Sequence, residues 1–347
     1  MSPYVSIVVL ISLLTGTLLT LMSNHWLMAW MGLEINTLAI IPFMTSSHHP
    51  RSTESTTKYF MIQATASMII MFSIIYNASM TNQWGMTQMH NQWASLLTTI
   101  SLAMKLGLAP FHFWVPEVIQ GISLLPGMTL LTWQKIAPIS ILYQISPSLN
   151  LPLLMTLSIA STILGGWGGL NQTHLRKILA YSSIAHMGWM TIIILIMPSL
   201  TLLNLLIYFA ATITLFMLFN LMDVTKINSL SNLWNKSPIL MIILTTTLLS
   251  LGGLPPLTGF MSKWLILKEL VTCKNAFTAT MLALSALLSL FFYMRIIYLS
   301  TLTMFPSTNN SKLHWTVSPK KSSSAIPLLA IISSLLLPLT PMFIILT

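Results

Sequence analysis

The sequence is poor in charged residues, and this scarcity excludes most classes of soluble protein. Only 6% of the 347 residues are Asp, Glu, Lys or Arg, whereas hydrophobic types make up 55%. Soluble domains carry about 25% charged residues, so this chain lacks the polar surface that keeps a globular protein in water. The missing charge predicts that lipid is the solvent for most of the chain.

Cysteine is nearly absent as well, because Cys273 is the only one in the sequence. A single thiol cannot close an internal disulfide, and an iron–sulfur cluster needs about four thiolates. No Walker loop occurs, and no run of Lys or Arg exceeds two residues despite a net charge of +10. We therefore expect no ATP-driven step, no metal or cofactor bound by this chain, and no nucleic-acid partner.

The N-terminal segment lacks a basic region ahead of its apolar run, and it lacks arginine altogether. It therefore resembles neither a secretory signal nor an Arg-rich transit peptide, and we expect it to be a retained membrane span. A chain this apolar without an address signal suggests synthesis at, or inside, its own membrane compartment.

Long apolar runs are what the sequence has in abundance. A transmembrane helix needs about 20 mainly apolar residues, and these runs are continuous, whereas barrel strands would alternate with period two. The prediction is an all-α integral membrane protein with eleven transmembrane helices and no separate soluble domain. The expected ranges are 3–22, 26–44, 59–78, 94–114, 126–145, 151–170, 175–197, 200–222, 238–270, 276–302 and 325–346.

Glycine and proline interrupt two of these runs. The fourth contains Gly107 and Pro110, and the ninth contains the stretch GGLPPLTG, which begins at Gly252. Proline removes a backbone donor and glycine holds a helix poorly, so both runs are predicted to be broken helices. Two coincidental kinks are the alternative interpretation.

The two interrupted runs stand five helices apart. Because five is odd, helices one to five and helices six to ten must have opposite topologies. The pattern predicts two inverted five-helix repeats, residues 1–145 and 151–302, followed by a C-terminal helix at 325–346. Paired interrupted spans in an inverted repeat point to a transport path.

Basic residues in the loops are distributed unevenly. They follow even-numbered helices far more often than odd-numbered ones, which places those loops and the N-terminus on the inner side of the membrane. An odd number of spans then puts the C-terminus on the outer side. The biased residues are Arg51, Lys58, Arg176, Lys177, Lys226, Lys236, Lys312, Lys320 and Lys321, against Lys268 and Lys274.

Four ionisable residues lie deep inside predicted spans, where charge is expensive. Glu34, Lys105 and Lys135 stand near the middle of their spans, and Lys263 follows the break in the ninth. Each costs about 2.5–3.5 kcal/mol at the bilayer centre, so each must face the interior, pair or contact water. A structural ion pair would explain Glu34 with one lysine, but no other acid lies at that depth for the remaining two.

A proton relay explains all four residues. Burial disfavours the charged form of an unpaired amine, so such a lysine can accept and release protons, and an opposite charge within about 4–6 Å favours the protonated form. Histidine can join such a relay. A haem between two histidines is disfavoured, since no pair at ligand spacing on facing helices is evident, and a packing role is the alternative for His186. The candidate relay residues are Glu34, Lys105, His112, Lys135, His186 and Lys263.

Three segments resemble the antiporter-like membrane subunits of respiratory complex I. They read MKLGLAPFHFWVPE from Met104, LAYSSIAHMG from Leu179 and LGGLPPLTGF from Leu251, and the resemblance extends over essentially the whole chain. The family implies fourteen helices, with a glutamate on the fifth and lysines on the seventh, eighth and twelfth. Here each of these residues stands three helices earlier, so the chain resembles the shortened animal mitochondrial form.

The resemblance also implies roles and a setting. Glu34 and Lys105 would form a modulating ion pair, Lys135 the central relay, and Lys263 the terminal donor toward the outer side. The chain would lie among like subunits and lipids in the mitochondrial inner membrane, with its N-terminus in the matrix. NADH, FMN, iron–sulfur clusters and ubiquinone would belong to other subunits, so no redox centre is expected here. A standalone cation/proton antiporter and a scaffold with structural charges are the alternatives.

Overall fold

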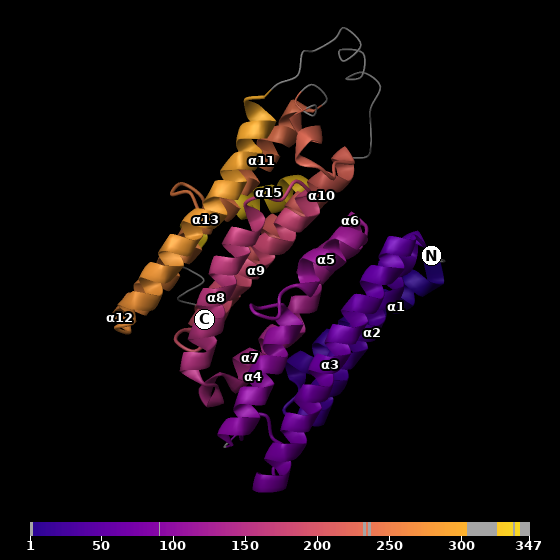
Figure 1. Ribbon diagram of the computed structural model, residues 1–347, viewed down its shortest axis with the longest axis vertical. Coiled ribbons are helices and arrows are strands. Elements are labelled where there is room, and N and C mark those ends of the chain that lie inside the picture. Colours follow the sequence, from indigo (N-terminus) through magenta and orange to yellow (C-terminus); the bar gives the residue numbers. More distant parts are fainter. Residues whose placement is uncertain are drawn as a thin grey trace. The chain divides into compact units, whose positions relative to one another are not determined.

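The computed structural model describes residues 3–89, 91–231, 234, 237–303, 325–335 and 337–340. Helices provide all the regular secondary structure in these ranges (Figure 1), which confirms the all-α prediction. Six helices in this part of the chain are long and apolar enough to cross a membrane. They are α1 (Pro3–Met22), α2 (Trp26–Met44), α3 (Pro50–Thr81), α8 (Leu151–Gly169), α10 (Pro198–Met222) and α13 (Ala276–Thr301).

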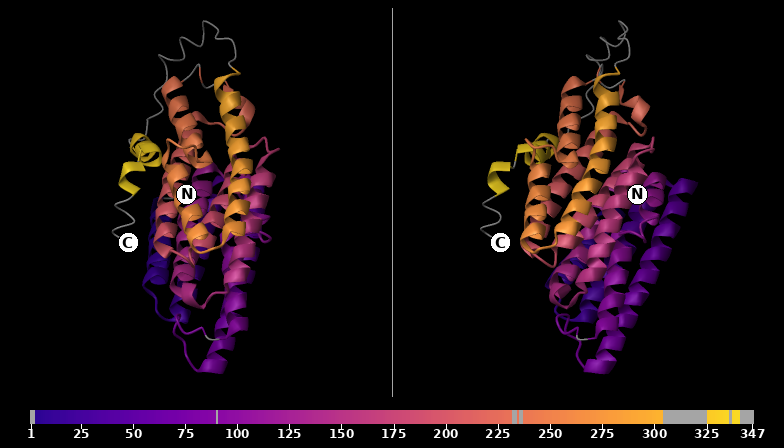
Figure 2. Two further views of the ribbon diagram at one scale, coloured as in Figure 1. Left: turned by 90° about the vertical axis from the view of Figure 1, so that its left-hand side faces the viewer. Right: turned by 60° about the vertical axis from the view of Figure 1, so that its left-hand side comes forward.

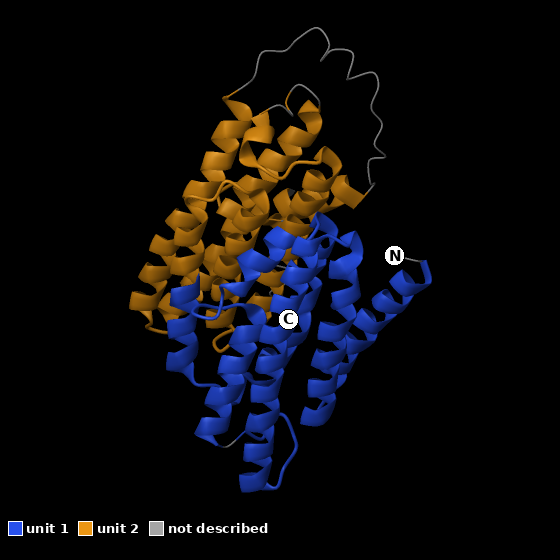
Figure 3. Cartoon of the chain, turned by 45° about the vertical axis from the view of Figure 1, so that its right-hand side comes forward, with its two compact units in different colours: residues 1–161 blue, residues 162–347 orange. Residues whose placement is uncertain are grey.

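The chain divides into two compact units, residues 1–161 and 162–347 (Figure 3). The boundary falls within α8. Unit 1 also contains the shorter helices α4 (Gln92–Leu106), α5 (Trp114–Gly121), α6 (Leu124–Leu131) and α7 (Trp133–Ile145). Unit 2 also contains α9 (Leu175–Ile193), α11 (Pro238–Gly252), α12 (Thr258–Thr272) and α15 (Ala325–Leu335).

Two glycines allow α1 and α2 to approach closely in unit 1. A Cβ atom on Gly16 would lie 2.4 Å from Asn36 Oδ1, and one on Gly32 would lie 2.9 Å from the Gly16 carbonyl oxygen. Small residues at helix contacts let backbones pack closely where no hydrophobic driving force is available. The pair also fixes Asn36, which is buried, beside the site described below.

Both predicted helix breaks are confirmed, and both have the same backbone geometry. Gly107 after α4 has φ 74°, and Gly253 after α11 has φ 81°. The N–H groups of Gly107 and Leu108 donate to the carbonyls three and five residues earlier, and those of Gly253 and Leu254 repeat the pattern. This is the Schellman cap, in which glycine takes the left-handed conformation that other residues avoid.

A third break lies where the sequence predicted one continuous helix at 126–145. The chain there forms α6 and α7, separated at Thr132. The Thr132 hydroxyl donates to the Met128 carbonyl over 2.8 Å, and Pro138 has no N–H to donate to the Gln134 carbonyl. Lys135 consequently lies in the first turn of α7, beside a break.

Helix α3 begins nine residues before the predicted span at 59–78. Pro50 occupies its first turn, and His49 caps it by accepting the Arg51 N–H at Nδ1 over 3.1 Å. Proline suits this position because its missing donor would have no partner there. Arg51 and Lys58, which the sequence analysis placed in a loop, therefore lie on the first turns of a helix.

In unit 2, α11 and α12 pack against α13, and α15 packs on α10 (Figure 2). Helix α15 has 11 residues, or about 16 Å at 1.5 Å per residue. The predicted span at 325–346 continues past this helix, and its residues 336 and 341–346 lie outside the described part. The loop residues Lys236, Lys312, Lys320 and Lys321 also lie outside it.

Candidate functional site

A small polar cavity in unit 1 is lined by two of the predicted relay lysines. Its volume open to the centre of a water molecule is about 20 Å³, and a site needs about 10–15 Å³ by this measure to hold one water. The polar side chains of the lining are Asn36, Thr37, Tyr59, Gln63, Lys105, Gln134 and Lys135. The cavity therefore has both the room and the hydrogen-bonding groups that a water requires.

Lys105 is in the last turn of α4, two residues before the cap at Gly107. Its side chain is buried, and its Nζ atom has no hydrogen-bond partner among the described residues. The C-terminus of a helix carries partial negative charge, which favours a cation there. The nearby Met104 carbonyl accepts the Trp114 Nε1 proton over 3.2 Å, so Trp114 links the two halves of the broken helix beside this amine.

Lys135 enters the same cavity from α7. It is buried, and the residue before it holds α7 against α2, because Gln134 Nε2 donates to the Asn36 carbonyl over 2.9 Å. The break at Thr132 brings Lys135 to the start of its helix. Two amines from different helices thus share one cavity large enough for water.

Glu34 is half-buried on α2 and lies outside the cavity lining. Its Oε2 atom accepts a 3.4 Å hydrogen bond from Thr37, and its Oε1 atom is buried without a partner in the described part of the chain. Glu34 is near enough to Lys105 for an electrostatic interaction, but no ion pair within 4.0 Å joins them among the described residues. The carboxylate and the amine are therefore neighbours that do not touch.

His112 lies in the turns between α4 and α5 and is buried. Its Nδ1 atom is 3.3 Å from the Pro110 carbonyl oxygen, and its ring packs on Phe113 with 4.3 Å between the ring centroids. The side chain is absent from the cavity lining that contains Lys105 and Lys135. The structure thus places His112 in the same helix break as Lys105, with its own backbone contact.

Unit 2 contains the fourth deep ionisable residue, Lys263 on α12. Its Nζ atom donates to the carbonyls of Leu251 and Gly252, over 3.2 and 3.0 Å. Gly253 leaves room for this amine, because a Cβ atom there would lie 3.1 Å from Lys263 Nζ. The lysine of one half-helix thereby caps the C-terminus of the other.

His186 lies in the middle of α9, also in unit 2. Its side chain is buried, and its ring lies 5.4 Å from the ring of Tyr208 on α10. The sequence analysis left a relay role and a packing role open for this residue. The tyrosine contact is compatible with both.

Sequence reasoning missed the polar side chains that line the cavity without being ionised. Tyr59 and Gln63 are one helical turn apart on α3, and Gln134 directly precedes Lys135. Polar residues at spacings of three or four inside an apolar run were the available signal, because such residues share one helix face.

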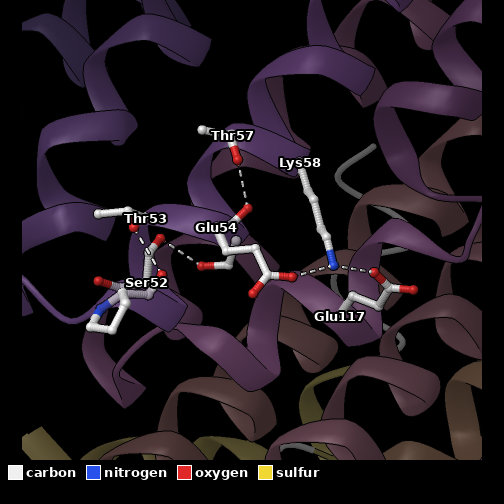
Figure 4. Close-up of polar contacts among 8 residues, drawn as sticks. Ser52, Thr53, Glu54, Thr57, Lys58 and Glu117 are labelled. Carbon is white, nitrogen blue, oxygen red and sulfur yellow. Dashed lines mark hydrogen bonds and ion pairs between the residues drawn. The ribbon is translucent and has the colours of Figure 1, made fainter.

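The exposed basic residue Lys58 joins α3 to α5 at the surface of unit 1 (Figure 4). Its Nζ atom lies 2.8 Å from Glu54 Oε1 and 3.0 Å from Glu117 Oε2. Exposed ion pairs of this kind contribute little to stability, because water screens the charges. The cluster therefore fixes the position of α5 only weakly, one helical turn from Trp114.

Solved structures of low sequence identity share this fold. A chain of the respiratory complex I from Thermus thermophilus with bound Aureothin superposes with a TM-score of 0.82 at 24% identity, over 95% of this chain and 78% of that one. A chain of the Mrp complex from Dietzia sp. DQ12-45-1b gives a TM-score of 0.82 at 16% identity, over 97% of this chain and 75% of that one. The protein is therefore a helical membrane protein of the antiporter-like fold class.

Sequence comparisons narrow the class to a family. The model of the NADH:quinone oxidoreductase/Mrp antiporter transmembrane family matches residues 23–289, and that of the NADH dehydrogenase subunit 2 C-terminus matches residues 290–344. The chain belongs to the NADH:quinone oxidoreductase/Mrp antiporter transmembrane family. It is similar to NADH-ubiquinone oxidoreductase chain 2 of Didelphis virginiana, at 73% identity over 344 residues, and of Bos taurus, at 53% over 342 residues. Each of these alignments covers 99% of both chains.

Proposed function

We propose that this chain is an antiporter-like membrane-arm subunit of respiratory complex I, and that it carries protons across the mitochondrial inner membrane. The relatives named above, which match over almost their full length, support the assignment to a complex that oxidises NADH and reduces ubiquinone. The observation that carries the proton path is the cavity shared by Lys105 and Lys135.

The cavity allows proton exchange between two amines. A charged amine at membrane depth is costly. The protonated form of each lysine is therefore stable only when nearby polar groups, water or an opposite charge stabilise it. A water between them can accept a proton from one amine and give another proton to the second. Glu34 stabilises the charged form of Lys105 when the two side chains approach, so its movement would load and release this end of the path.

Lys263 is suited to the release step in unit 2. A charged amine has three N–H donors, and the neutral amine keeps two. Either form can therefore donate to both the Leu251 and Gly252 carbonyls. A proton can arrive or leave without displacing the side chain, and His186 on α9 would supply it. His112 would conduct protons at the break beside Lys105.

The wider arrangement belongs to the same proposal. Eleven spans would form two inverted five-helix repeats and a C-terminal helix, and the matching Schellman caps after α4 and α11 support such a repeat. The N-terminus would face the matrix and the C-terminus the intermembrane space. Lipids and other subunits would surround the chain, and NADH, FMN, the iron–sulfur clusters and ubiquinone would be bound by those other subunits.

Replacing Lys135 by Met tests the proposal. The matched control is Lys268→Met, because Lys268 is an exposed lysine on α12. In the assembled complex reconstituted in vesicles, Lys135→Met is expected to slow proton pumping by at least about tenfold, and the control to leave it unchanged. The amount of assembled complex should remain normal in both variants.

The outcomes separate the alternatives. Normal pumping by a fully assembled Lys135→Met complex would contradict the relay. A loss of assembly in proportion to activity would favour the scaffold. Purification of the chain alone, with cation/proton exchange in vesicles and without flavin or iron–sulfur subunits, would favour a standalone antiporter.

A further inference from the structure

Two buried tyrosines in unit 2 lie between His186 and Lys263, and the mechanism above does not use them. Tyr208 on α10 is 1% exposed, and Tyr293 on α13 is 2% exposed. Burying a hydroxyl at membrane depth costs free energy unless the hydroxyl is hydrogen-bonded, and a phenylalanine would fill the same space without that cost. Their hydroxyl groups therefore need an explanation.

The first contact joins Tyr208 to the histidine. The rings of His186 and Tyr208 are tilted by 37° with 5.4 Å between their centroids. The Tyr208 hydroxyl also interacts with the side chain of Ser183, which is three residues before His186 on α9. The histidine and the phenol therefore meet on one face of α9.

The two tyrosines also lie near each other. Tyr208 and Tyr293 are close enough for an electrostatic interaction between their side chains. The Tyr293 hydroxyl lies near Ser182 but makes no hydrogen bond of normal geometry with any described residue. A buried hydroxyl without a protein partner is the kind of group that an internal water satisfies.

The second contact joins Tyr293 to the lysine end. A Cβ atom on Gly252 would lie 3.8 Å from Tyr293 Cδ2, so the tyrosine ring packs on the Gly252 backbone. The Gly252 carbonyl accepts a 3.0 Å hydrogen bond from Lys263 Nζ. The Tyr293 ring and the amine that the proposed function assigns to proton release therefore both lie next to Gly252.

We propose that Tyr208 and Tyr293 form a phenol bridge that carries protons from His186 to Lys263. The inference rests on the proposed function, since it needs a proton to arrive at Lys263. It assigns to α10 and α13 the step between a histidine on α9 and a lysine on α12. Waters that bridge buried polar groups complete the steps longer than one hydrogen bond.

The transfer leaves no phenolate behind. A protonated His186 gives its proton to the Tyr208 oxygen as the original Tyr208 proton moves toward Tyr293, and the Tyr293 proton then moves to the neutral Lys263 amine. Each oxygen forms one O–H bond and breaks one. The histidine ends neutral and the lysine ends charged. Rotation of the two hydroxyl groups resets the bridge.

Removing each hydroxyl tests the bridge. Tyr208→Phe and Tyr293→Phe are compared with Tyr298→Phe, which alters a 57% exposed tyrosine on the same helix as Tyr293. We expect the first two to slow proton pumping by about threefold to tenfold in the reconstituted complex, which is the effect on a rate of losing one hydrogen bond. The control variant should pump at the normal rate.

A purely structural role of the hydroxyl predicts that its removal lowers stability and leaves the pumping rate of the assembled complex unchanged. The Tyr293 hydroxyl has no partner in the described part of the chain, so removing it should leave assembly and thermal stability unchanged or improved. Slower pumping with unimpaired stability therefore supports the bridge. If Tyr208→Phe fails to assemble, Tyr293→Phe alone decides. A larger solvent deuterium isotope effect on pumping in wild type than in Tyr293→Phe further supports the bridge.

Two further comparisons keep this inference separate from the proposed function. The double variant Tyr208→Phe/Tyr293→Phe should pump no more slowly than the slower single variant, because both hydroxyls serve one path. Lys263→Met is measured in parallel. If Lys263→Met loses pumping while both phenylalanine variants pump normally, the bridge is wrong and the proposed function stands. If Lys263→Met also pumps normally, the proposed function fails.

Discussion

The two broken helices of this molecule end in the same way but treat their lysines differently. Both end at a glycine with positive φ and both carry the Schellman pattern of hydrogen bonds. In unit 1, Lys105 belongs to the helix that ends, and its amine has no partner among the described residues. In unit 2, Lys263 belongs to the helix that follows, and its amine donates to two carbonyls.

In the proposed proton path, this contrast lets one backbone motif take part in two different steps. Lys105 belongs to the last turn of α4, and the Lys263 amine lies at the C-terminus of α11, where partial negative charge favours a cation. In unit 1 the Met104 carbonyl accepts from both Gly107 and Trp114, and Lys105 lines a cavity. Lys263 keeps the carbonyls of Leu251 and Gly252 as permanent acceptors. One amine has no partner among the described residues and lines a cavity with room for water, and the other is held by two hydrogen bonds.

Replacing each lysine by Met gives the largest expected effects. Lys105→Met and Lys263→Met should both abolish proton pumping, but their stabilities should diverge. Lys263→Met leaves two buried carbonyls unpaired at about 1–3 kcal/mol each, whereas Lys105→Met removes an amine that had no partner among the described residues. Thermal melting of the assembled complex measures the difference. Equal melting temperatures would contradict the contrast drawn between the two units.

Alanine at each capping glycine comes next. The left-handed conformation costs a residue with a Cβ about 1–2 kcal/mol. A Cβ on Gly107 would also lie 2.4 Å from Val115 Cγ2, whereas one on Gly253 would lie 3.1 Å from the flexible end of Lys263. Gly107→Ala should therefore be the more destabilising variant, and Gly253→Ala should mainly slow pumping. Melting temperatures and pumping rates are measured on both variants. A lower melting temperature for Gly253→Ala than for Gly107→Ala would contradict this prediction.

The ion-pair cluster of Lys58 provides a smaller test within unit 1. Glu117→Gln breaks the contact between α3 and α5, whereas Glu54→Gln breaks only a contact within α3. Each should lower the free energy of unfolding only slightly, and less at high salt. Glu117→Gln should be the only one of the two to alter pumping, because α5 carries Trp114 and Val115 of the cavity wall. Identical pumping in the two variants would show that the contact between α3 and α5 does not affect the cavity.

The smallest effect concerns His174, in the loop before α9 of unit 2. Unlike Lys58, it lies among cations. Partial burial, followed by the charges of Lys226, Lys177 and Arg176, lowers the pKa of His174 below its ordinary value of 6.5. As the pH falls below 6.5, the unfolded chain is protonated first, so stability declines until the folded pKa is passed. His174→Gln should remove this decline, as melting temperatures measured across that pH range would show.

The sequence predicted the helical class, the two glycine breaks and the deep lysines because each depends on local chemistry. Gly107 with Pro110, and Gly253 with Pro255, indicate a break whatever packs around them, and a lysine inside an apolar run is costly in any arrangement. The break at Thr132 was missed, because Pro138 lies inside a run that otherwise reads as continuous. The start of α3 was missed because its first turns are polar, and only Pro50 and the cap at His49 indicate a helix there.

The composition of the cavity could not be predicted, because it depends on which helices pack together. Glu34 was expected to pair with Lys105, and only the packing of α2 leaves its Oε1 atom without a partner among the described residues. Tyr59 and Gln63 become part of the site only because α3 turns their shared face inward. Spacing along one helix shows that residues share a face, but it does not show what the face meets.

The contact between Gly16 and Gly32 has a mechanical consequence. The Gly16 carbonyl oxygen would be 2.9 Å from a Cβ at Gly32, and the Thr20 methyl group would be 2.6 Å from it. Sliding α1 along α2 by one turn would bring a residue with a side chain into a notch that accepts none. We therefore expect α1 and α2 to move as one body, and any relative movement of helices in unit 1 to occur at the interrupted helices.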